Sequence, residues 1–380
     1  MSAATEERVA LRKSAQAFVE KEVLPSLQEW EDLGEVPRSL HEAAAKQGFL
    51  GLGVSQASGG SGGDFLDALT LTEAMAETGA SSGLLAALFT SGIALPHIIA
   101  SGDADLVDRF VRPTLAGELI GALAVTEPGG GSDVAGLTTR ATRDGDHYVV
   151  NGSKSFITSG VRADFVTTAV RTGGPGYAGL SLLVVEKGTP GLSVTRSLKK
   201  MGWHCSDTAE LSFVDCRVPA SNLVGEENAG FAMIAAQFVT ERLALAVHGY
   251  GIAARALALT ASYTKERSTF GRPLASRQVV QHTLVEMHRR VEVARSYTRE
   301  VARRYVNREN PVAEALMAKS TAVGACSFVV DQAVQLHGGV GYMHGVEVER
   351  HYRDARILGI GGGATEVLND LTARLLGYTG

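Results

Sequence analysis

The apolar residues in the first third of the chain recur at helical spacing. Five positions near the start show this: Val9, Ala15, Phe18, Val19 and Val23. Such spacing is typical of helices that bury one face. Pro37 suits a first helical position and Gly48 a C-terminal cap, so a helix is predicted over 37–47, and another over 64–78. We therefore expect an N-terminal α-helical domain over residues 1–118.

In the middle of the chain the pattern changes to short runs rich in Val, Thr and Phe. Asp-Gly at 144–145 and Asn-Gly at 151–152 bracket the run 147–150. This is a strong hairpin signal because both dipeptides tolerate positive φ. Three further strands are predicted, at 165–170, 180–185 and 210–213. The pattern predicts a small all-β domain over residues 119–228.

Gly and Pro become sparse inside the long segments of the last third. Four of these segments have helical periodicity: 229–264, 276–306, 312–337 and 347–377. A four-helix bundle is the economical packing for four such helices. We therefore expect a C-terminal bundle domain over residues 229–380 and an α+β, mainly α, fold for the whole chain.

Composition and charge narrow the class of protein. The 380 residues include 36 Lys plus Arg against 41 Asp plus Glu, a net charge of −5, and 45% are hydrophobic. These values exclude a disordered or fibrous chain. Nucleic acid is not an expected partner, because the sequence shows no cluster of Lys and Arg for phosphates. Three distant cysteines, Cys205, Cys216 and Cys326, suggest neither a disulfide framework nor a zinc site, and the ten histidines show no metal-ligand spacing.

Two observations bear on location. The most apolar stretch, 84–95, is about twelve residues long, whereas a membrane span needs about 20. The N-terminus carries Glu6 and Glu7 early and shows no apolar core before a cleavage site, so secretion and organelle import are unsupported. Because the cysteine usage also fits a reducing compartment, we expect a cytoplasmic protein without a membrane span.

Two runs carry candidate chemistry. Residues 125–136 (VTEPGGGSDVAG) place three glycines beside Ser and Asp. Such a loop has amides free to bind an anion, although the same residues could form an ordinary tight loop. Residues 154–160 (KSFITSG) place Phe156 on a strand, where it is either an inward-facing residue or a wall for a flat ring.

These two runs are joined by three more: 267–274 (RSTFGRPL), 335–342 (QLHGGVGY) and 349–355 (ERHYRDA). In order and spacing the five runs resemble the motifs of the acyl-CoA dehydrogenase family, over nearly the whole chain. The resemblance implies an N-terminal helical domain, a middle small β-barrel and a C-terminal four-helix bundle, as the periodicity already suggests.

The resemblance also implies FAD as the cofactor. A pyrophosphate needs backbone amides and a flat apolar ring needs an aromatic wall. The positions implied to bind the cofactor within one subunit are Thr126, Gly131, Ser132, Phe156 and Thr158. In the family a neighbouring subunit completes the adenine half, and the matching positions here are Arg267, Phe270, Gln335 and Gly339, with Gln278 close by. A homotetramer built as a dimer of dimers is therefore expected.

The implied reaction is the oxidation of an acyl-CoA thioester to the trans-2-enoyl thioester. A carboxylate removes the α-proton, the β-hydrogen leaves as hydride, and the thioester carbonyl is polarised by a flavin ribityl hydroxyl and a backbone N–H. The commonest family pattern has the catalytic Glu where Gly362 stands. The N–H at this position survives the loss of the side chain. The substrate-binding positions implied by the resemblance are Ser132, Phe238, Arg242 and Gly361.

Glu241 is the expected base. It shares a helical face with Phe238, Leu245 and other mostly apolar residues, so it is either a solvated edge or a functional group in a cleft. The isovaleryl-CoA and long-chain branches of the family place their Glu directly before an Arg on this helix, as Glu241 stands before Arg242. Glu366 is the rival carboxylate, and we expect it at the start of the following helix.

Two further departures from the family pattern affect the site. Ala364 stands where a flavin-contacting Thr is usual, and Gly345 stands where an acidic or amide residue is expected.

The sequence leaves three hypotheses for the function. The favoured one is an acyl-CoA dehydrogenase that passes its electrons to an electron-transferring flavoprotein. The alternatives are a flavin-dependent monooxygenase or oxidase on the same fold, and a non-catalytic CoA-binding homologue.

Overall fold

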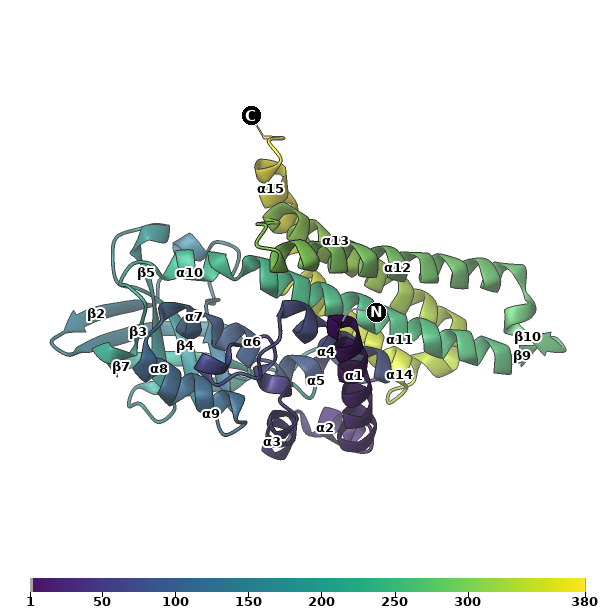
Figure 1. Ribbon diagram of the computed structural model, residues 1–380, viewed down its shortest axis with the longest axis horizontal. Coiled ribbons are helices and arrows are strands. Elements are labelled where there is room, and N and C mark those ends of the chain that lie inside the picture. The colour runs from purple at the N-terminus through teal and green to yellow at the C-terminus, as the bar shows by residue number, and fades with distance from the viewer. Residues whose placement is uncertain (1–2, 380) are drawn as a thin grey trace.

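Three groups of elements follow one another along the chain in the computed structural model, which describes residues 3–379 (Figure 1). The first group is helical: α1 (Ala3–Phe18), α2 (Leu27–Leu33), α3 (Arg38–Lys46), α4 (Phe65–Thr78), α5 (Ser82–Leu88), α6 (Ser91–Ala94), α7 (Pro96–Ser101), α8 (Ala104–Leu106) and α9 (Arg112–Leu115). The helix predicted over 37–47 is α3, with Pro37 as its N-cap and not as its first residue. The helix predicted over 64–78 is α4, whose N-cap Asp64 forms a capping box with Asp67.

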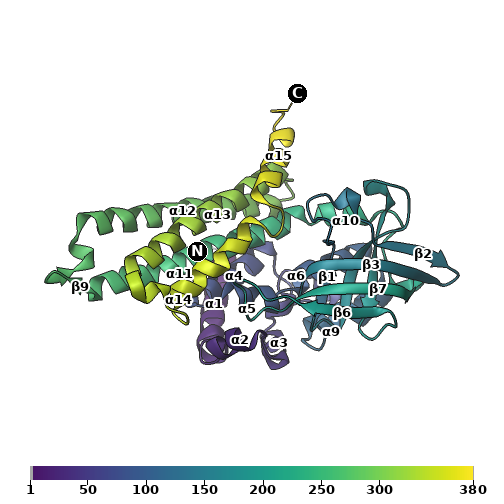
Figure 2. The same ribbon diagram turned by 180° about the vertical axis from the view of Figure 1, so that it is seen from behind.

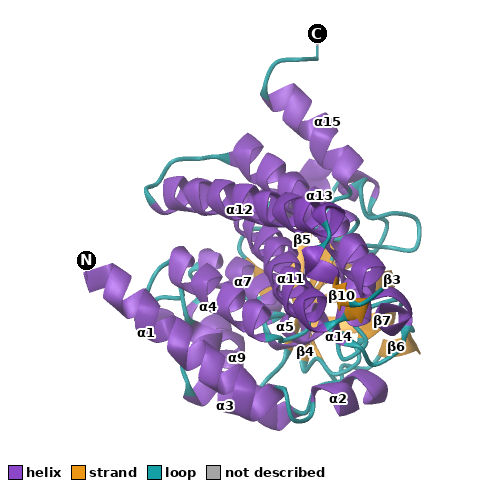
Figure 3. Cartoon of the chain, turned by 90° about the vertical axis from the view of Figure 1, so that its right-hand side faces the viewer, coloured by secondary structure: helices purple, strands orange, loops and turns teal. Residues whose placement is uncertain are grey.

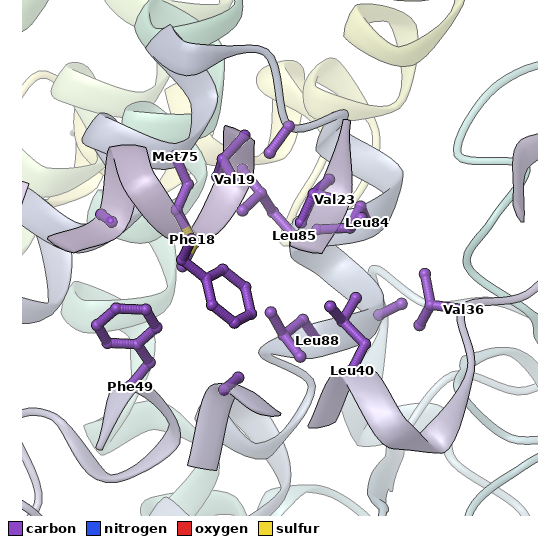
Figure 4. Packing of buried hydrophobic residues seen from close by; sticks show 14 of the residues in the cluster. Phe18, Val19, Val23, Val36, Leu40, Phe49, Met75, Leu84, Leu85 and Leu88 are labelled. Carbon is purple, nitrogen blue, oxygen red and sulfur yellow. The ribbon is translucent and has the colours of Figure 1, made fainter. Parts of the chain in front are cut away.

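The N-terminal helices bury a core of their own. Leu84, Leu85 and Leu88 from α5 are each no more than 1% exposed and pack against Phe18 and other apolar residues of the first helices (Figure 4). The apolar side chains of this cluster fill the interior between the helices. The cluster holds α1, α3, α4 and α5 together as one body.

The middle group is a single curved sheet of eight strands. Its strands are β1 (Gly121–Ala124), β2 (Arg140–Asp144), β3 (His147–Thr158), β4 (Phe165–Arg171), β5 (Leu180–Glu186), β6 (Leu192–Ser197), β7 (Thr208–Pro219) and β8 (Leu223–Val224). The order is β6-β7-β3-β2-β4-β5-β8, and β1 pairs with β4 in parallel. The strands surround one apolar core. Because the pairing runs from β6 to β8 without joining them, the predicted barrel is an open one among the described residues.

The hairpin prediction was right at one of its two turns. Asp144 pairs with His147 across the first turn. The Asn-Gly dipeptide at 151–152 is not a turn but lies inside β3, where the register shifts. Gly152 has φ +148, and a Cβ there would stand 2.6 Å from the hydroxyl of Thr139, so the glycine permits a bulge with close packing.

The last group is the bundle. Its helices are α10 (Gly230–Ala236), α11 (Phe238–Glu266), α12 (Gln278–Val306), α13 (Val312–His337), α14 (Glu347–Ala355) and α15 (Thr365–Leu375). The helix predicted over 347–377 was wrong, because the chain breaks between α14 and α15. Gly362 and Gly363 have φ of +61 and +92, which no helix contains. Figure 2 shows α15 pointing away from the bundle after this break.

Helices α11 and α13 are the most apolar long elements. Helix α11 and the segment Val312–Tyr342, which contains α13, are long and apolar enough to cross a membrane by length and composition. Their apolar residues instead form the bundle core. Figure 3 shows the bundle helices viewed along the long axis of the molecule. This packing accounts for their composition within a folded domain.

Candidate active site

Glu241 lies in the first turn of α11, next to the middle domain. The preceding Phe238 packs against the apolar cluster between the sheet and the N-terminal helices. Arg242 Nη1 donates a hydrogen bond of 2.6 Å to Glu241 Oε2, and its guanidinium lies 4.2 Å from the centre of the Phe238 ring. The Glu241 side chain is 31% exposed, whereas that of Arg242 is 8% exposed. The carboxylate is therefore held at one oxygen and accessible.

The other oxygen of Glu241 faces the loop 361–363. A Cβ built on Gly362 would stand 3.3 Å from Glu241 Oε1 and 2.3 Å from Cδ1 of Leu245. A side chain at 362 would thus enter the space that Glu241 and Leu245 occupy. The Glu241 carboxylate therefore lies beside the position that a side chain at 362 would take.

The 125–136 loop presents an open backbone. Gly130 N–H donates to the carbonyl of Glu127, and Ser155 N–H donates to the carbonyl of Thr126 at 2.9 Å, which joins the loop to β3. No atom lies within 4 Å of a Cβ built on Gly129 or Gly130. Gly131 packs against the Thr126 side chain. Ser132 is exposed.

A buried ion pair joins this loop to β3. Lys154 is fully buried, and its Nζ donates to Glu127 Oε1 and to the carbonyl of Val125, each at 3.0 Å. Glu127 also accepts hydrogen bonds from Thr138 and from the amide of Thr139. Burial alone would raise the pKa of Glu127, but the Lys154 ammonium and the hydrogen bonds outweigh it and lower that pKa to about 2.

Phe156 points out of β3. Its side chain is 67% exposed and its φ is +60, at a bulge between Lys154 and Ile157. The inward-facing alternative for Phe156 is therefore wrong. Thr158 follows at the end of the strand, partly buried and paired with Thr208. The exposed aromatic ring and the open amides of the 125–136 loop fit a flat ring joined to a pyrophosphate.

The second set of predicted cofactor residues lies at the other end of the bundle. Five exposed residues form it: Arg267, Phe270, Gln278, Gln335 and Gly339. Arg267 follows the end of α11, whose 29 residues span about 43 Å from the end that holds Glu241 (Figure 1). Tyr263 near that far end donates to the carbonyl of His337, so the ends of α11 and α13 meet there. One chain does not bring the two sets together.

Gly345 and Ala364 are the two further positions at which the sequence departs from the family pattern, and the structure explains the first of them. Gly345 has φ +86 in the turn before α14, a conformation that a side chain strains, so glycine suits this turn. Ala364 is the N-cap of α15 and makes no side-chain capping bond there. Glu366 is exposed in the first turn of α15, as expected.

Sequence reasoning missed two buried lysines and the acid that pairs with one of them. Glu127 and Lys154 lie inside the runs 125–136 and 154–160, but their pairing can be predicted only when the position of β3 against the loop is known. Lys319 is buried in α13 and contacts the loop 361–363. The available signal was a single lysine in the apolar helical run 315–330.

Comparison with known proteins identifies the family of this protein. Models of the N-terminal, middle and C-terminal domains of acyl-CoA dehydrogenases match residues 5–118, 122–216 and 228–377. The mitochondrial long-chain specific acyl-CoA dehydrogenase of Rattus norvegicus is 38% identical over 96% of this chain and 85% of its own length. A crystal structure from Mycobacterium smegmatis assigned to this enzyme class is 60% identical, with a TM-score of 0.98, over 100% of this chain and 99% of that one. The chain belongs to the acyl-CoA dehydrogenase family of oxidoreductases.

Other relatives bear on cofactor and substrate. The structure of PigA in complex with FAD has a TM-score of 0.95 at 27% identity, over 100% of this chain and 99% of that chain. Isobutyryl-CoA dehydrogenase of Bos taurus is 37% identical over 98% of this chain and 89% of its own length. The cofactor of this family is FAD, and the open loop and exposed Phe156 of this chain fit it.

Proposed function

We propose that the protein catalyses the α,β-dehydrogenation of an acyl-CoA thioester to the trans-2-enoyl thioester. Glu241 removes the α-proton through Oε1, while Arg242 holds Oε2. The N–H of Gly362 donates to the thioester carbonyl, which stabilises the negative charge that develops when the proton leaves. When bound, FAD supplies the two-electron acceptor of the reaction.

One observation carries this proposal. Glu241 Oε1 lies 3.3 Å from where a side chain at 362 would begin. The family's commonest pattern has its carboxylate at that position. A base at 241 therefore reaches the same α-carbon from helix α11, whereas a base at 362 would reach it from the loop. The 31% exposure of Glu241 leaves it accessible to a substrate.

Three residues are proposed to bind the CoA moiety, and two of them, Phe238 and Arg242, lie beside Glu241 on α11. Arg242 offers a cationic guanidinium, Phe238 an apolar ring beneath it, and Ser132 a hydroxyl on the exposed loop. Gly361 leaves the wall of the acyl pocket without a side chain. These residues suit a thioester with a polar tail and an apolar acyl group.

Electrons then pass to an electron-transferring flavoprotein. Two relatives support this part of the proposal. A subunit of the caffeyl-CoA reductase–Etf complex of Acetobacterium woodii is 34% identical over 96% of both chains. A structure described as the electron-transferring flavoprotein of Acidaminococcus fermentans matches with a TM-score of 0.93 at 32% identity.

The oxidase alternative stays open because the fold also serves that chemistry. The prolyl acyl carrier protein oxidase AnaB matches with a TM-score of 0.93 at 28% identity. The two reactions differ in how the reduced flavin is reoxidised. Fast reoxidation by air favours an oxidase, whereas slow reoxidation by air in the presence of enoyl-CoA, with fast reoxidation by an electron-transferring flavoprotein, favours a dehydrogenase.

We propose a homotetramer built from dimers that share FAD sites. The support is the separation of Phe156 and Thr126 from Arg267 and Phe270 within one chain. Phe270 is 97% exposed, which suits a residue that contacts a second chain. A purified protein that stays monomeric with FAD bound would contradict this assembly.

An anaerobic titration with straight and branched acyl-CoAs tests the proposed function. Each acyl-CoA is added to the FAD-loaded protein, and loss of flavin absorbance is followed. We expect at least one acyl-CoA to reduce the flavin fully and to yield its 2-enoyl-CoA. A flavin that no acyl-CoA reduces would support the non-catalytic homologue.

A further inference from the structure

Lys319 lies in the N-terminal third of α13 and is 1% exposed. Its Nζ donates to three successive carbonyl oxygens: those of Gly361 at 2.5 Å, Gly362 at 3.3 Å and Gly363 at 2.7 Å. A lysine ammonium has three N–H donors and no acceptor, so all its donors serve this loop.

Apart from the hydrogen bond that the Gly361 N–H donates to the carbonyl of Ile357 at 2.8 Å, the loop has little of its own to fix its conformation. Its three glycines lack side chains, and two of them have positive φ, so the unrestrained segment would populate many conformations. Within residues 3–379, no backbone carbonyl accepts the N–H of Gly362. The carbonyls on both sides of this N–H are the ones that Lys319 holds.

A charged group in this position is unfavourable unless it has a specific role. Burial, and to a lesser extent the Arg242 guanidinium, lowers the pKa of Lys319 to about 8, although Glu241 opposes the change. An apolar side chain of similar length would avoid the desolvation of the ammonium. What it could not do is bond to three carbonyls at once.

We propose that Lys319 is a positioning residue of the active site, which fixes the peptide planes of 361–363 and so directs the Gly362 N–H at the thioester carbonyl. The Gly362 N–H shares one planar peptide group with the Gly361 carbonyl, so holding that oxygen sets the direction of the N–H, and the bond to the Gly362 carbonyl fixes the next peptide plane. Lys319 acts through the loop and does not touch the substrate. The inference rests on the proposed dehydrogenation, in which that N–H polarises the carbonyl.

The first test does not depend on activity. Hydrogen–deuterium exchange of the FAD-loaded protein is compared between the wild type and Lys319→Met. We expect exchange in peptides covering 359–365 to rise at least about 10-fold in the variant, with little change in the 125–136 loop. Ser320→Ala is the matched control, because Ser320 is the next residue on α13 and its buried hydroxyl has no partner.

The second test reads the carbonyl directly. The carbonyl stretching band of a bound enoyl-CoA, labelled with ¹³C at the thioester carbon, reports its polarisation. In Lys319→Met we expect this band to move towards its frequency in free solution, and flavin reduction by acyl-CoA to slow at least about 10-fold with little change in acyl-CoA affinity. A merely structural lysine would weaken binding and stability without this separation.

The outcomes distinguish the two proposals. If no acyl-CoA reduces the wild-type flavin, the proposed function fails, and the exchange of 359–365 still decides whether Lys319 fixes the loop. If the wild type is active and Lys319→Met has unchanged exchange, carbonyl band and rate, the assignment of Lys319 is overturned. If the Met variant does not fold, Lys319→Gln keeps N–H donors without the charge, and an intermediate effect on all three readouts is expected.

Discussion

Leu245 and the backbone of Gly362 make position 362 an unfavourable place for a side chain in the proposed active site. Leu245 Cδ1 lies 2.3 Å from the Cβ that a side chain at 362 would add, and Gly362 has φ +61. A left-handed conformation costs an ordinary residue about 1–2 kcal/mol. The site therefore accepts its base from α11 more readily than from the loop.

Moving the carboxylate tests this exclusion. We expect Glu241→Gln with Gly362→Glu to recover little flavin reduction, because the new side chain meets Leu245. Adding Leu245→Ala should raise the rate above that of the double variant. The measurement is single-turnover flavin reduction, with Leu245→Ala alone as the control. A double variant as fast as the triple one would show that Leu245 does not exclude a side chain at 362.

The proposed base Glu241 follows from the sequence, whereas the proposed role of Lys319 does not. The Glu-Arg pair at 241–242 is a local pattern that a family resemblance can assign, and Gly362 marks the vacated position. The role of Lys319 depends on the packing of α13 against a loop more than forty residues later. No periodicity encodes that contact.

At the scale of elements, the ion pair between Glu127 and Lys154 joins the 125–136 loop to β3. The pKa of Glu127 in the folded protein, about 2, is below its ordinary value of 4.5. The unfolded chain therefore takes up this proton first as the pH falls. The stability that the ionised carboxylate contributes is complete above about pH 4.5 and is lost as the pH falls towards 2.

Glu127→Gln should reveal that contribution. At pH 7 the variant leaves Lys154 buried without its partner, and we expect a loss on the order of 3 kcal/mol in the free energy of unfolding. The difference from wild type should shrink between pH 4.5 and pH 2. Denaturant unfolding at several pH values measures it. A difference that stays constant over this range would contradict the assigned pKa.

Helix α15 begins without a side-chain cap, because Ala364 occupies its N-cap. Ser and Thr at such a position accept a hydrogen bond from the first turn, and replacing them by Ala typically costs about 0.5–2 kcal/mol. We expect Ala364→Ser to slow hydrogen exchange in the first turn of α15. Ala373→Ser, at the other end of the helix, is the control. Unchanged exchange at the first turn would show that this end is already satisfied.

The elements were predicted well where one local pattern decided them. Strands β4 and β5 and helices α12 and α13 begin and end within about two residues of the predicted positions. Two of the failures fell on glycines. Asn-Gly usually makes a turn, so the sequence predicts one at 151–152, but close packing with Thr139 requires Gly152 within a strand. The glycines at 361–363 interrupt a helical periodicity that continues on both sides.

At the scale of the whole molecule, the two sets of residues proposed to bind the cofactor lie at opposite ends of helix α11. Glu241 begins α11 and Arg267 follows its end. If a partner chain supplies Arg267, each complete site draws residues from two chains.

Mixed assemblies test this arrangement. Glu241→Gln and Arg267→Ala proteins are dissociated, mixed and reassembled. In a mixed dimer, one site carries both changes and the other carries neither. Random pairing should therefore restore about one quarter of the wild-type activity, well above either parent. Dye reduction by acyl-CoA measures it. Activity that stays at the mean of the parents would place Arg267 outside a shared site.

The central claim is that Glu241 is the catalytic base, and anaerobic single-turnover reduction of the FAD-loaded protein tests it most directly. We expect Glu241→Gln to keep FAD and acyl-CoA binding while flavin reduction slows at least about 10³-fold, within the range for loss of a general base. Glu366→Gln, which removes an exposed carboxylate from the first turn of α15, should keep most of its rate. A Glu241→Gln protein whose flavin is still reduced, beside a Glu366→Gln protein whose flavin is not, would contradict the account.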